Sequence, residues 1–158
     1  MAEYKIDLED IKQRYAHNKI GWVRESGVFL DEVGERYVRM KLPLADLHIN
    51  HVGIAYAGSI FMLGEVSTAA IIYSAYGTDK YIPIASRIEI DYLKPSTTDL
   101  VLEYSMTEEE RDTLIAPILE RGKGKIALEY FITNEEGEQV AKMKAVVYLM
   151  PAGQQLKK

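Results

Sequence analysis

Residues 50–70 read NHVGIAYAGSIFMLGEVSTAA, and this stretch decides the fold. A turn of small residues opens a nearly all-apolar segment, which we expect to form a helix that starts near Ala57, ends by Gly77 and is roughly 30 Å long. A helix that is apolar on every side belongs in the middle of a protein. One acid, Glu65, interrupts it, and a buried charge is costly unless partners or chemistry hold it. Glu65 is therefore the first candidate for a functional residue.

The composition limits the class of protein. A chain of 158 residues suits one domain, so we expect a single domain over residues 1–158. The net charge of −5 argues against nucleic-acid binding, because phosphate recognition depends on Lys and Arg. The sequence has no cysteine, which excludes disulfides, thiolate nucleophiles and cysteine zinc sites. Residues 1–10 are charged and do not resemble a secretory signal, and Glu65 is unfavourable in a membrane span, so we expect a cytoplasmic protein without a membrane partner.

Apolar periodicity predicts the remaining elements. Apolar residues recur at helical spacing in two segments and alternate at strand spacing in six. The expected elements are an N-terminal helix at 7–18 (within 1–19), strands at 22–30, 37–42, 84–93 and 100–106, a helix at 108–121 interrupted by Pro117, strands at 126–132 and 139–150, and a mobile tail at 151–158. Hairpin turns and clean alternation favour antiparallel pairing. The fold class is therefore α+β, with six antiparallel strands around one central helix.

The offsets between small and polar residues before Glu65 are the most specific motif in the chain. Asn50 is followed by Gly53 three residues later, then by Tyr56-Ala57-Gly58, and then by Glu65 nine residues after Tyr56. This pattern resembles the signature of hotdog-fold acyl-CoA thioesterases, particularly the phenylacetate-pathway type and a less characterised branch of that superfamily. The order of strands and helices is similar to the hotdog fold from about residue 21 to residue 150, with an added N-terminal helix.

The resemblance implies a thioesterase site. Glu65 would act as general base on water or attack the thioester carbonyl, Asn50 would orient the reacting groups, and the Ala57 and Gly58 amides would hold the oxyanion. The substrate-binding candidates are Gly53, Tyr56, Ser67 and Thr68. Tyr56 stands where the family has His, and Ala57 stands where it has the first Gly. An apolar surround should raise the pKa of Glu65 toward the range of a base at neutral pH.

The same resemblance implies the partners. The substrate would be an acyl-CoA or acyl carrier protein thioester, hydrolysed without a metal or cofactor. Hotdog sites form between two subunits whose strands pair across the interface, so a homodimer or homotetramer is expected. Phosphates of coenzyme A could meet Arg87, Lys94 or the basic run at 121–125, although an exposed charge is usually only solvated.

Each candidate residue also has a plainer interpretation. Glu65 could be a buried acid satisfied by Tyr or Asn, and Asn50 an ordinary loop residue. His48 and His51 could contribute to a metal site with Glu65, but two loop histidines without a clear third ligand are typically solvated, so we expect no metal. The alternative to an enzyme is a non-catalytic hotdog module that binds an acyl ligand or assembles. A hydratase is less favoured, because no His is paired with the acid.

Overall fold

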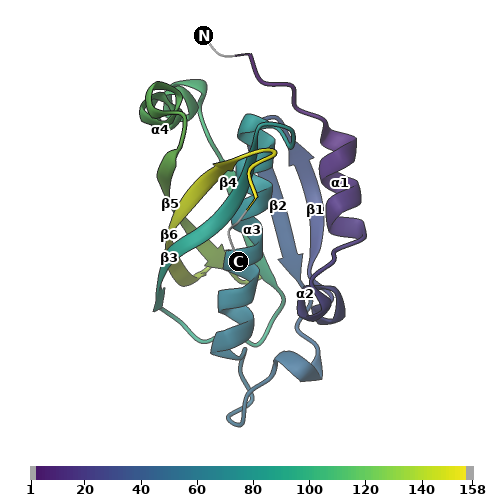
Figure 1. Cartoon of the computed structure of the whole chain (residues 1–158). Helices are drawn as coiled ribbons and strands as arrows, with labels where there is room; N and C mark the ends of the chain where they lie inside the picture. The colour runs from purple at the N-terminus through teal and green to yellow at the C-terminus, as the bar shows by residue number, and fades with distance from the viewer. Residues whose placement is uncertain (1–2, 156–158) are drawn as a thin grey trace.

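The computed structural model describes residues 3–155, and Figure 1 shows a long helix held inside a curved sheet. The chain has four α-helices, one 3-10 helix and six strands within these residues. In chain order they are α1 (Leu8–Ala16), α2 (Gly21–Ser26), β1 (Phe29–Gly34), β2 (Tyr37–Leu42), η1 (Asp46–His48), α3 (Ala57–Tyr76), β3 (Tyr81–Tyr92), β4 (Leu100–Ser105), α4 (Glu108–Arg121), β5 (Gly124–Thr133) and β6 (Gln139–Pro151).

The six strands form one antiparallel sheet in the order β1-β2-β4-β5-β6-β3. The sheet curves around α3, and α1 packs against β1 and α3. This arrangement confirms the expected α+β hotdog fold with a central helix. The twelve-residue β3 is an edge strand, so one side of its backbone has no partner strand within residues 3–155.

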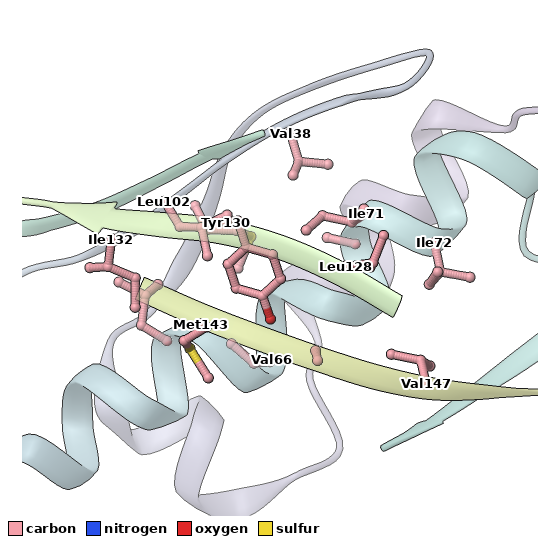
Figure 2. Packing of buried hydrophobic residues seen from close by; sticks show 14 of the residues in the cluster. Val38, Val66, Ile71, Ile72, Leu102, Leu128, Tyr130, Ile132, Met143 and Val147 are labelled. Carbon is pink, nitrogen blue, oxygen red and sulfur yellow. The ribbon is translucent and has the colours of Figure 1, made fainter. Parts of the chain in front are cut away.

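The core lies between α3 and the concave face of the sheet. Alternate residues of β5 point inward and are buried, as expected for a half-buried strand: Ile126, Leu128, Tyr130 and Ile132. Figure 2 shows side chains of β5 and β6 directed at α3. At Gly64 the approach is so close that an added Cβ would lie 1.7 Å from the Sδ atom of Met143. Glycine is therefore required there for the helix to reach the sheet.

The length and composition of α3 would also suit a membrane span. Its most apolar window has a mean hydropathy of 1.3, but 67% of that window is buried inside the protein. Because the sheet already covers this apolar surface, the helix is explained as the core of the fold.

The segment expected as a strand at 22–30 is different, and the prediction is wrong over residues 22–28, because β1 begins only at Phe29. Residues Gly21–Ser26 form α2, in which Val23 and Ser26 are buried and Trp22 is 56% exposed. Burial at a spacing of three residues is helical, and six residues are too few to distinguish it from alternation. Gly27 then takes a positive φ of 79°, which ends the helix and delays the strand to Phe29.

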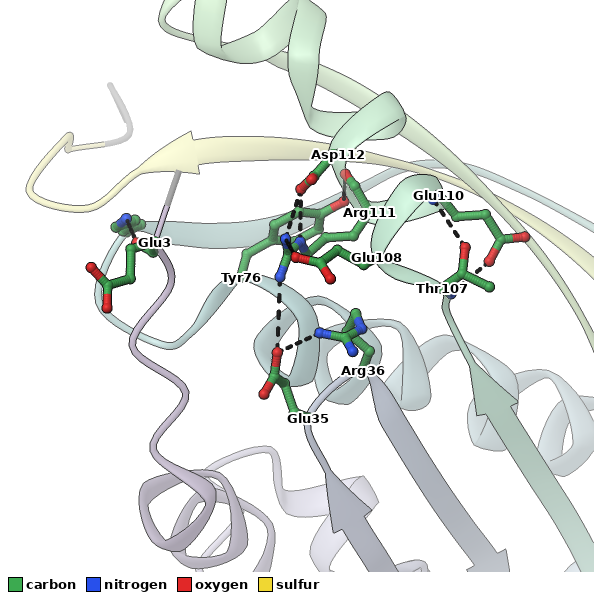
Figure 3. A network of polar contacts seen from close by, with 10 residues as sticks. Glu3, Glu35, Arg36, Tyr76, Thr107, Glu108, Glu110, Arg111 and Asp112 are labelled. Atoms are coloured by element: carbon green, nitrogen blue, oxygen red, sulfur yellow. Dashed lines mark hydrogen bonds and ion pairs between the residues drawn. The ribbon is translucent and has the colours of Figure 1, made fainter. Parts of the chain in front are cut away.

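The helix α4 has the expected bounds, but Pro117 does not interrupt it. Its start is the predicted capping box, in which Thr107 and Glu110 each bond the other's backbone amide. Arg111 is buried between α4 and the end of α3, and Figure 3 shows it surrounded by acidic side chains and by Tyr76, whose hydroxyl donates to the Arg111 carbonyl at 3.0 Å. These contacts and the buried Ile115 and Ile118 hold the helix on both sides of the proline.

The remaining predictions concern the turns and the tail. The hairpin turn after β5 is confirmed, because Gly137 has a positive φ and donates to the Asn134 carbonyl. The predicted mobile tail at 151–158 lies partly outside the described residues, which end at 155.

Candidate active site

The loop before α3 is organised by Asn50. Its side-chain oxygen accepts hydrogen bonds from the amides of Val52 at 3.0 Å and Ile54 at 3.2 Å, and its own amide donates to the Ile54 carbonyl. Gly53 supplies the turn with a positive φ of 81°, which L-residues rarely adopt. The loop is thereby folded back so that Asn50 lies beside the first turn of the helix, where it lines a cavity with Ala57.

The first amides of α3 are available for a ligand. Tyr56 is the N-cap and its side chain makes no capping hydrogen bond. Within the described residues, the amides of Ala57 and Gly58 donate to no protein acceptor, whereas the next two amides bond the Tyr56 carbonyl. Unsatisfied amides at a helix N-terminus favour an anion or a developing negative charge.

Two tyrosines frame these amides. The Tyr56 ring folds over Gly58, so that an added Cβ on Gly58 would lie 2.5 Å from a Tyr56 ring carbon. The Tyr92 hydroxyl donates to the Ala57 carbonyl at 2.9 Å and ties the end of β3 to the helix. Burial, and then the nearby Tyr56, raise the pKa of Tyr92.

The cavity at the helix start has a volume of about 380 Å³. Its polar members are the amide side chain of Asn50, the Tyr92 hydroxyl and one cation, Lys94, which is ion-paired with Glu138. Arg87 is paired with Glu89 on β3. Of the basic residues named from the sequence, Lys94 is thus the one that lines this cavity.

Glu65 lies in a second cavity of about 370 Å³, between α1, α3 and β3. Its carboxylate is half-buried and has no hydrogen-bond or ion-pair partner among residues 3–155. Burial raises the pKa of this carboxyl, as expected from the sequence. The cavity is lined by both polar and apolar residues: Arg14, Tyr15, His17, Asn18, Lys19, Ile20, Val66, Thr68, Ala69, Tyr73, Pro83 and Ala85.

The helix backbone on either side of Glu65 is anchored by tyrosine hydroxyls. Tyr130 donates to the Gly64 carbonyl at 2.9 Å, and Tyr15 donates to the Val66 carbonyl at 2.8 Å. Burial raises the pKa of both hydroxyls, and the nearby Glu65 adds to the effect. Both tyrosines therefore remain neutral donors, and they fix the stretch of helix that carries the acid.

Ser67 and Thr68 are placed differently. Ser67 is fully buried and donates to the Leu63 carbonyl at 2.6 Å, so its hydroxyl is used inside the helix. Thr68 lines the Glu65 cavity and donates to the Glu65 carbonyl at 2.7 Å. Of the two, Thr68 is the one beside the carboxylate.

The structure brings most candidates together in two groups rather than one. Asn50, Gly53, Tyr56, Ala57 and Gly58 gather at the start of α3, while Glu65 and Thr68 lie two turns further on. Eight residues of helix separate Ala57 from Glu65 by about 12 Å along the axis. Within one chain the amides and the carboxylate line different cavities, and neither cavity holds both groups.

The two groups nevertheless share one face of the helix. The less buried positions of α3 recur every four residues, which places them in a single stripe. This stripe consists of Ala57, Phe61, Glu65, Ala69 and Tyr73.

The sequence interpretation was wrong about His48. It is 1% exposed rather than solvated, and both ring nitrogens are hydrogen-bonded, so it is not available to a metal. Tyr15 and Tyr92 were also missed as parts of the site. No local signal in the sequence shows that these hydroxyls reach the backbone of α3, because each contact joins segments more than 30 residues apart.

Comparison with known proteins gives the same fold. A protein of unknown function and "probable thioesterase" from Pseudomonas aeruginosa superposes with a TM-score of 0.82 at 28% identity, over 95% of this chain and 99% of its own. A Haemophilus influenzae thioesterase superposes with a TM-score of 0.73 at 11% identity, over 97% of this chain and 96% of its own. A Streptococcus mutans protein bound to acetyl CoA gives 0.61 at 16% identity, over 79% and 90%.

Sequence comparison adds the family. The model of a domain of unknown function, DUF4442, matches residues 10–149. No curated protein sequence matches the chain. The structural neighbours share the hotdog fold and include thioesterases, which agrees with the resemblance found from residues 50–65.

Proposed function

Because the chain belongs to the DUF4442 family and has the hotdog fold of thioesterases, we propose that it hydrolyses an acyl-CoA or acyl carrier protein thioester to a carboxylic acid and a free thiol. One observation carries the proposal. Glu65 is a half-buried, unpaired carboxylate with a raised pKa at the wall of a cavity, and perturbed acids of this kind concentrate at functional sites. The acetyl CoA bound to the Streptococcus mutans neighbour supports the ligand class.

We place the reaction between two copies of the chain. The α3 stripe carries free amides at one end and Glu65 in its middle. If two α3 helices meet antiparallel across a two-fold axis, Glu65 of one subunit comes next to the Ala57 and Gly58 amides of the other. The unpaired edge of β3 gives such a dimer a second contact through strand pairing, and a homotetramer could be built from two of these dimers.

The chemistry then follows from the two groups. Glu65 takes a proton from water while the water oxygen bonds to the thioester carbonyl carbon. The carbonyl oxygen becomes an oxyanion that accepts hydrogen bonds from the Ala57 and Gly58 amides, each worth about 3 kcal/mol in the transition state. When the carbon–sulfur bond breaks, the thiolate leaves and takes the proton back from Glu65. In the other route the Glu65 carboxylate bonds to the carbonyl carbon, the carbon–sulfur bond breaks and the thiolate leaves with a proton from solvent; water then cleaves the resulting anhydride to the carboxylic acid and the Glu65 carboxylate.

The remaining candidates have supporting roles in the proposed site. Asn50 has its side-chain oxygen engaged in the loop, so its amide nitrogen is the group left to bind a ligand in the cavity that Asn50 lines with Ala57. Gly53 and Tyr56 shape the approach to the amides, and Thr68 borders the carboxylate. We propose that Ser67 acts only through helix packing. A single domain, without a cofactor and located in the cytoplasm, where CoA thioesters are found, completes the proposal.

The second candidate function is a non-catalytic module that binds an acyl ligand. Tyr56 favours it, because a phenol cannot replace a histidine as an acid or base near pH 7. The two functions differ in what Glu65 does, so one substitution separates them.

The test measures free-thiol release from short, medium, long and aromatic acyl-CoAs. Glu65→Gln should lower kcat by about a hundredfold or more while ligand affinity stays within about twofold, because only the reacting group is lost. Glu120→Gln, the same change on an exposed residue of α4, is the matched control. Absence of hydrolysis with every substrate in the folded wild-type protein would favour the binding module.

A further inference from the structure

The buried His48 occupies the base of the loop that leads into α3. Its ring bonds two segments that are distant in sequence: Nδ1 lies 2.8 Å from the Ser59 hydroxyl, and Nε2 lies 2.7 Å from the Ser26 carbonyl oxygen. Its own carbonyl accepts from the Tyr56 amide at 2.7 Å. His48 thus bonds Tyr56, just before the free amides of Ala57 and Gly58, and Ser59, just after them.

The partners determine the tautomer of the ring. A carbonyl oxygen only accepts, so Nε2 must carry the proton and donate to Ser26. In the neutral ring Nδ1 is then an acceptor, and the Ser59 hydroxyl must donate to it. Ser59 is 3% exposed, and its hydroxyl makes no other hydrogen bond within residues 3–155. His48 therefore supplies the hydrogen bond that this buried hydroxyl needs.

We infer that the hydrogen bond from Ser59 to His48 is what aims the Ala57 and Gly58 amides, which makes both side chains positioning residues of the site. This inference rests on the proposed function, because it gives those amides a use. The first turn of a helix has few backbone bonds of its own and frays readily. A buried side-chain bond to a different segment of the chain prevents the turn from shifting, and small shifts of a positioned donor reduce rate strongly.

Two substitutions of His48 separate the bond to Ser59 from simple filling of space. His48→Gln places its amide nitrogen near Nε2, so it keeps the donor for Ser26 and loses the acceptor for Ser59. His48→Asn places its oxygen near Nδ1, so it keeps the acceptor for Ser59 and loses the donor for Ser26. Ser59→Ala removes the same bond as His48→Gln from the other side.

The kinetic test follows kcat and KM for thioester hydrolysis. His48→Gln and Ser59→Ala should each lower kcat by about tenfold with little change in KM, and the double variant should lose no more than either alone. His48→Asn should restore most of the kcat. Ser74→Ala removes a buried hydroxyl at the far end of α3, where it bonds only the Ile71 carbonyl, and should leave kcat unchanged.

A second measurement does not depend on catalysis. Amide hydrogen exchange of Ser59 and Ile60, which both donate to the Tyr56 carbonyl, should speed up about fivefold or more in His48→Gln and Ser59→Ala but not in His48→Asn or Ser74→Ala. Equal effects of both His48 variants, or additive losses in the double variant, would overturn the inference. If the wild type hydrolyses nothing, the proposed function fails and the exchange rates alone decide; if His48→Gln does not fold, Ser59→Ala decides.

Discussion

Ala57 and Glu65 lie on the same stripe of α3, yet each borders a different cavity. The helix holds them about 12 Å apart along its axis, and neither cavity is lined by both residues. Because both residues lie on the less buried face of α3, a second copy of the chain can contact them together. In the arrangement that we propose, two copies related by a two-fold axis bring the pair together in two equivalent sites.

Ala57→Pro tests whether a helix amide stabilises the oxyanion. Ala57 is the first residue of α3, where proline is well tolerated, and Tyr56 before it already has the extended conformation that precedes proline, with φ −68° and ψ 132°. The change removes one N–H and little else. We expect kcat to fall by about a hundredfold with the melting temperature nearly unchanged. Unchanged turnover in the folded variant would remove Ala57 from the oxyanion hole.

Phe61→Cys tests the arrangement of the two subunits. Phe61 lies midway between Ala57 and Glu65 on the stripe, so in an antiparallel pair it faces the same residue of the partner subunit. The chain has no other cysteine, and a disulfide requires Cα atoms about 4.4–6.8 Å apart. We expect oxidation to give a cross-linked dimer on a non-reducing gel. Glu120→Cys on α4 is the control, and equal cross-linking of the two variants would contradict the arrangement.

The raised pKa of Glu65 predicts a pH-dependent cost in stability. Burial favours the protonated acid in the folded protein, so its stabilising contribution is complete below the ordinary pKa of 4.5 and is lost as pH rises through the folded-state value. Relative to wild type, Glu65→Gln should therefore gain free energy of unfolding from pH 4 to pH 7.5. Urea denaturation of both proteins at each pH measures this. A difference that shrinks with rising pH would mean that the folded protein stabilises the carboxylate.

Tyr15→Phe tests the anchoring of α1 beside Glu65. The substitution removes the hydroxyl that donates to the Val66 carbonyl at 2.8 Å, and we expect a loss of about 1 kcal/mol in the free energy of unfolding. Tyr148→Phe is the matched control, since Tyr148 is half-buried on β6 and its hydroxyl makes no hydrogen bond within the described residues. The control should change stability by less than about 0.5 kcal/mol in the same urea titration.

Much of the fold could be predicted because its signals are local. Apolar residues predominate over the twenty positions of α3, alternate residues of β5 are buried, and Thr107 with Glu110 starts α4, so each signal lies within a short stretch of the chain. The segment at 22–30 failed because α2 has only six residues and buries just two of them. A pattern that short fits a strand and a helix equally well.

The candidate site was predictable in part for the same reason. Glu65 stood out as the one charge in a long apolar segment, and its raised pKa follows from that setting alone. The role of His48 did not, because its ring partners lie 11 and 22 residues away and meet only after folding. The sequence around a histidine does not show whether its ring is solvated or buried, because tertiary contacts determine this.

Gly64, the residue next to Glu65, has a consequence for the direction of the acid. The sheet approaches Gly64 so closely that Met143 occupies the place of its missing side chain. If α3 rotated about its own axis, a residue with a side chain would take the place of Gly64 and collide with Met143. The close contact at Gly64 therefore fixes the rotation of α3 about its axis, and with it the direction in which the Glu65 side chain points.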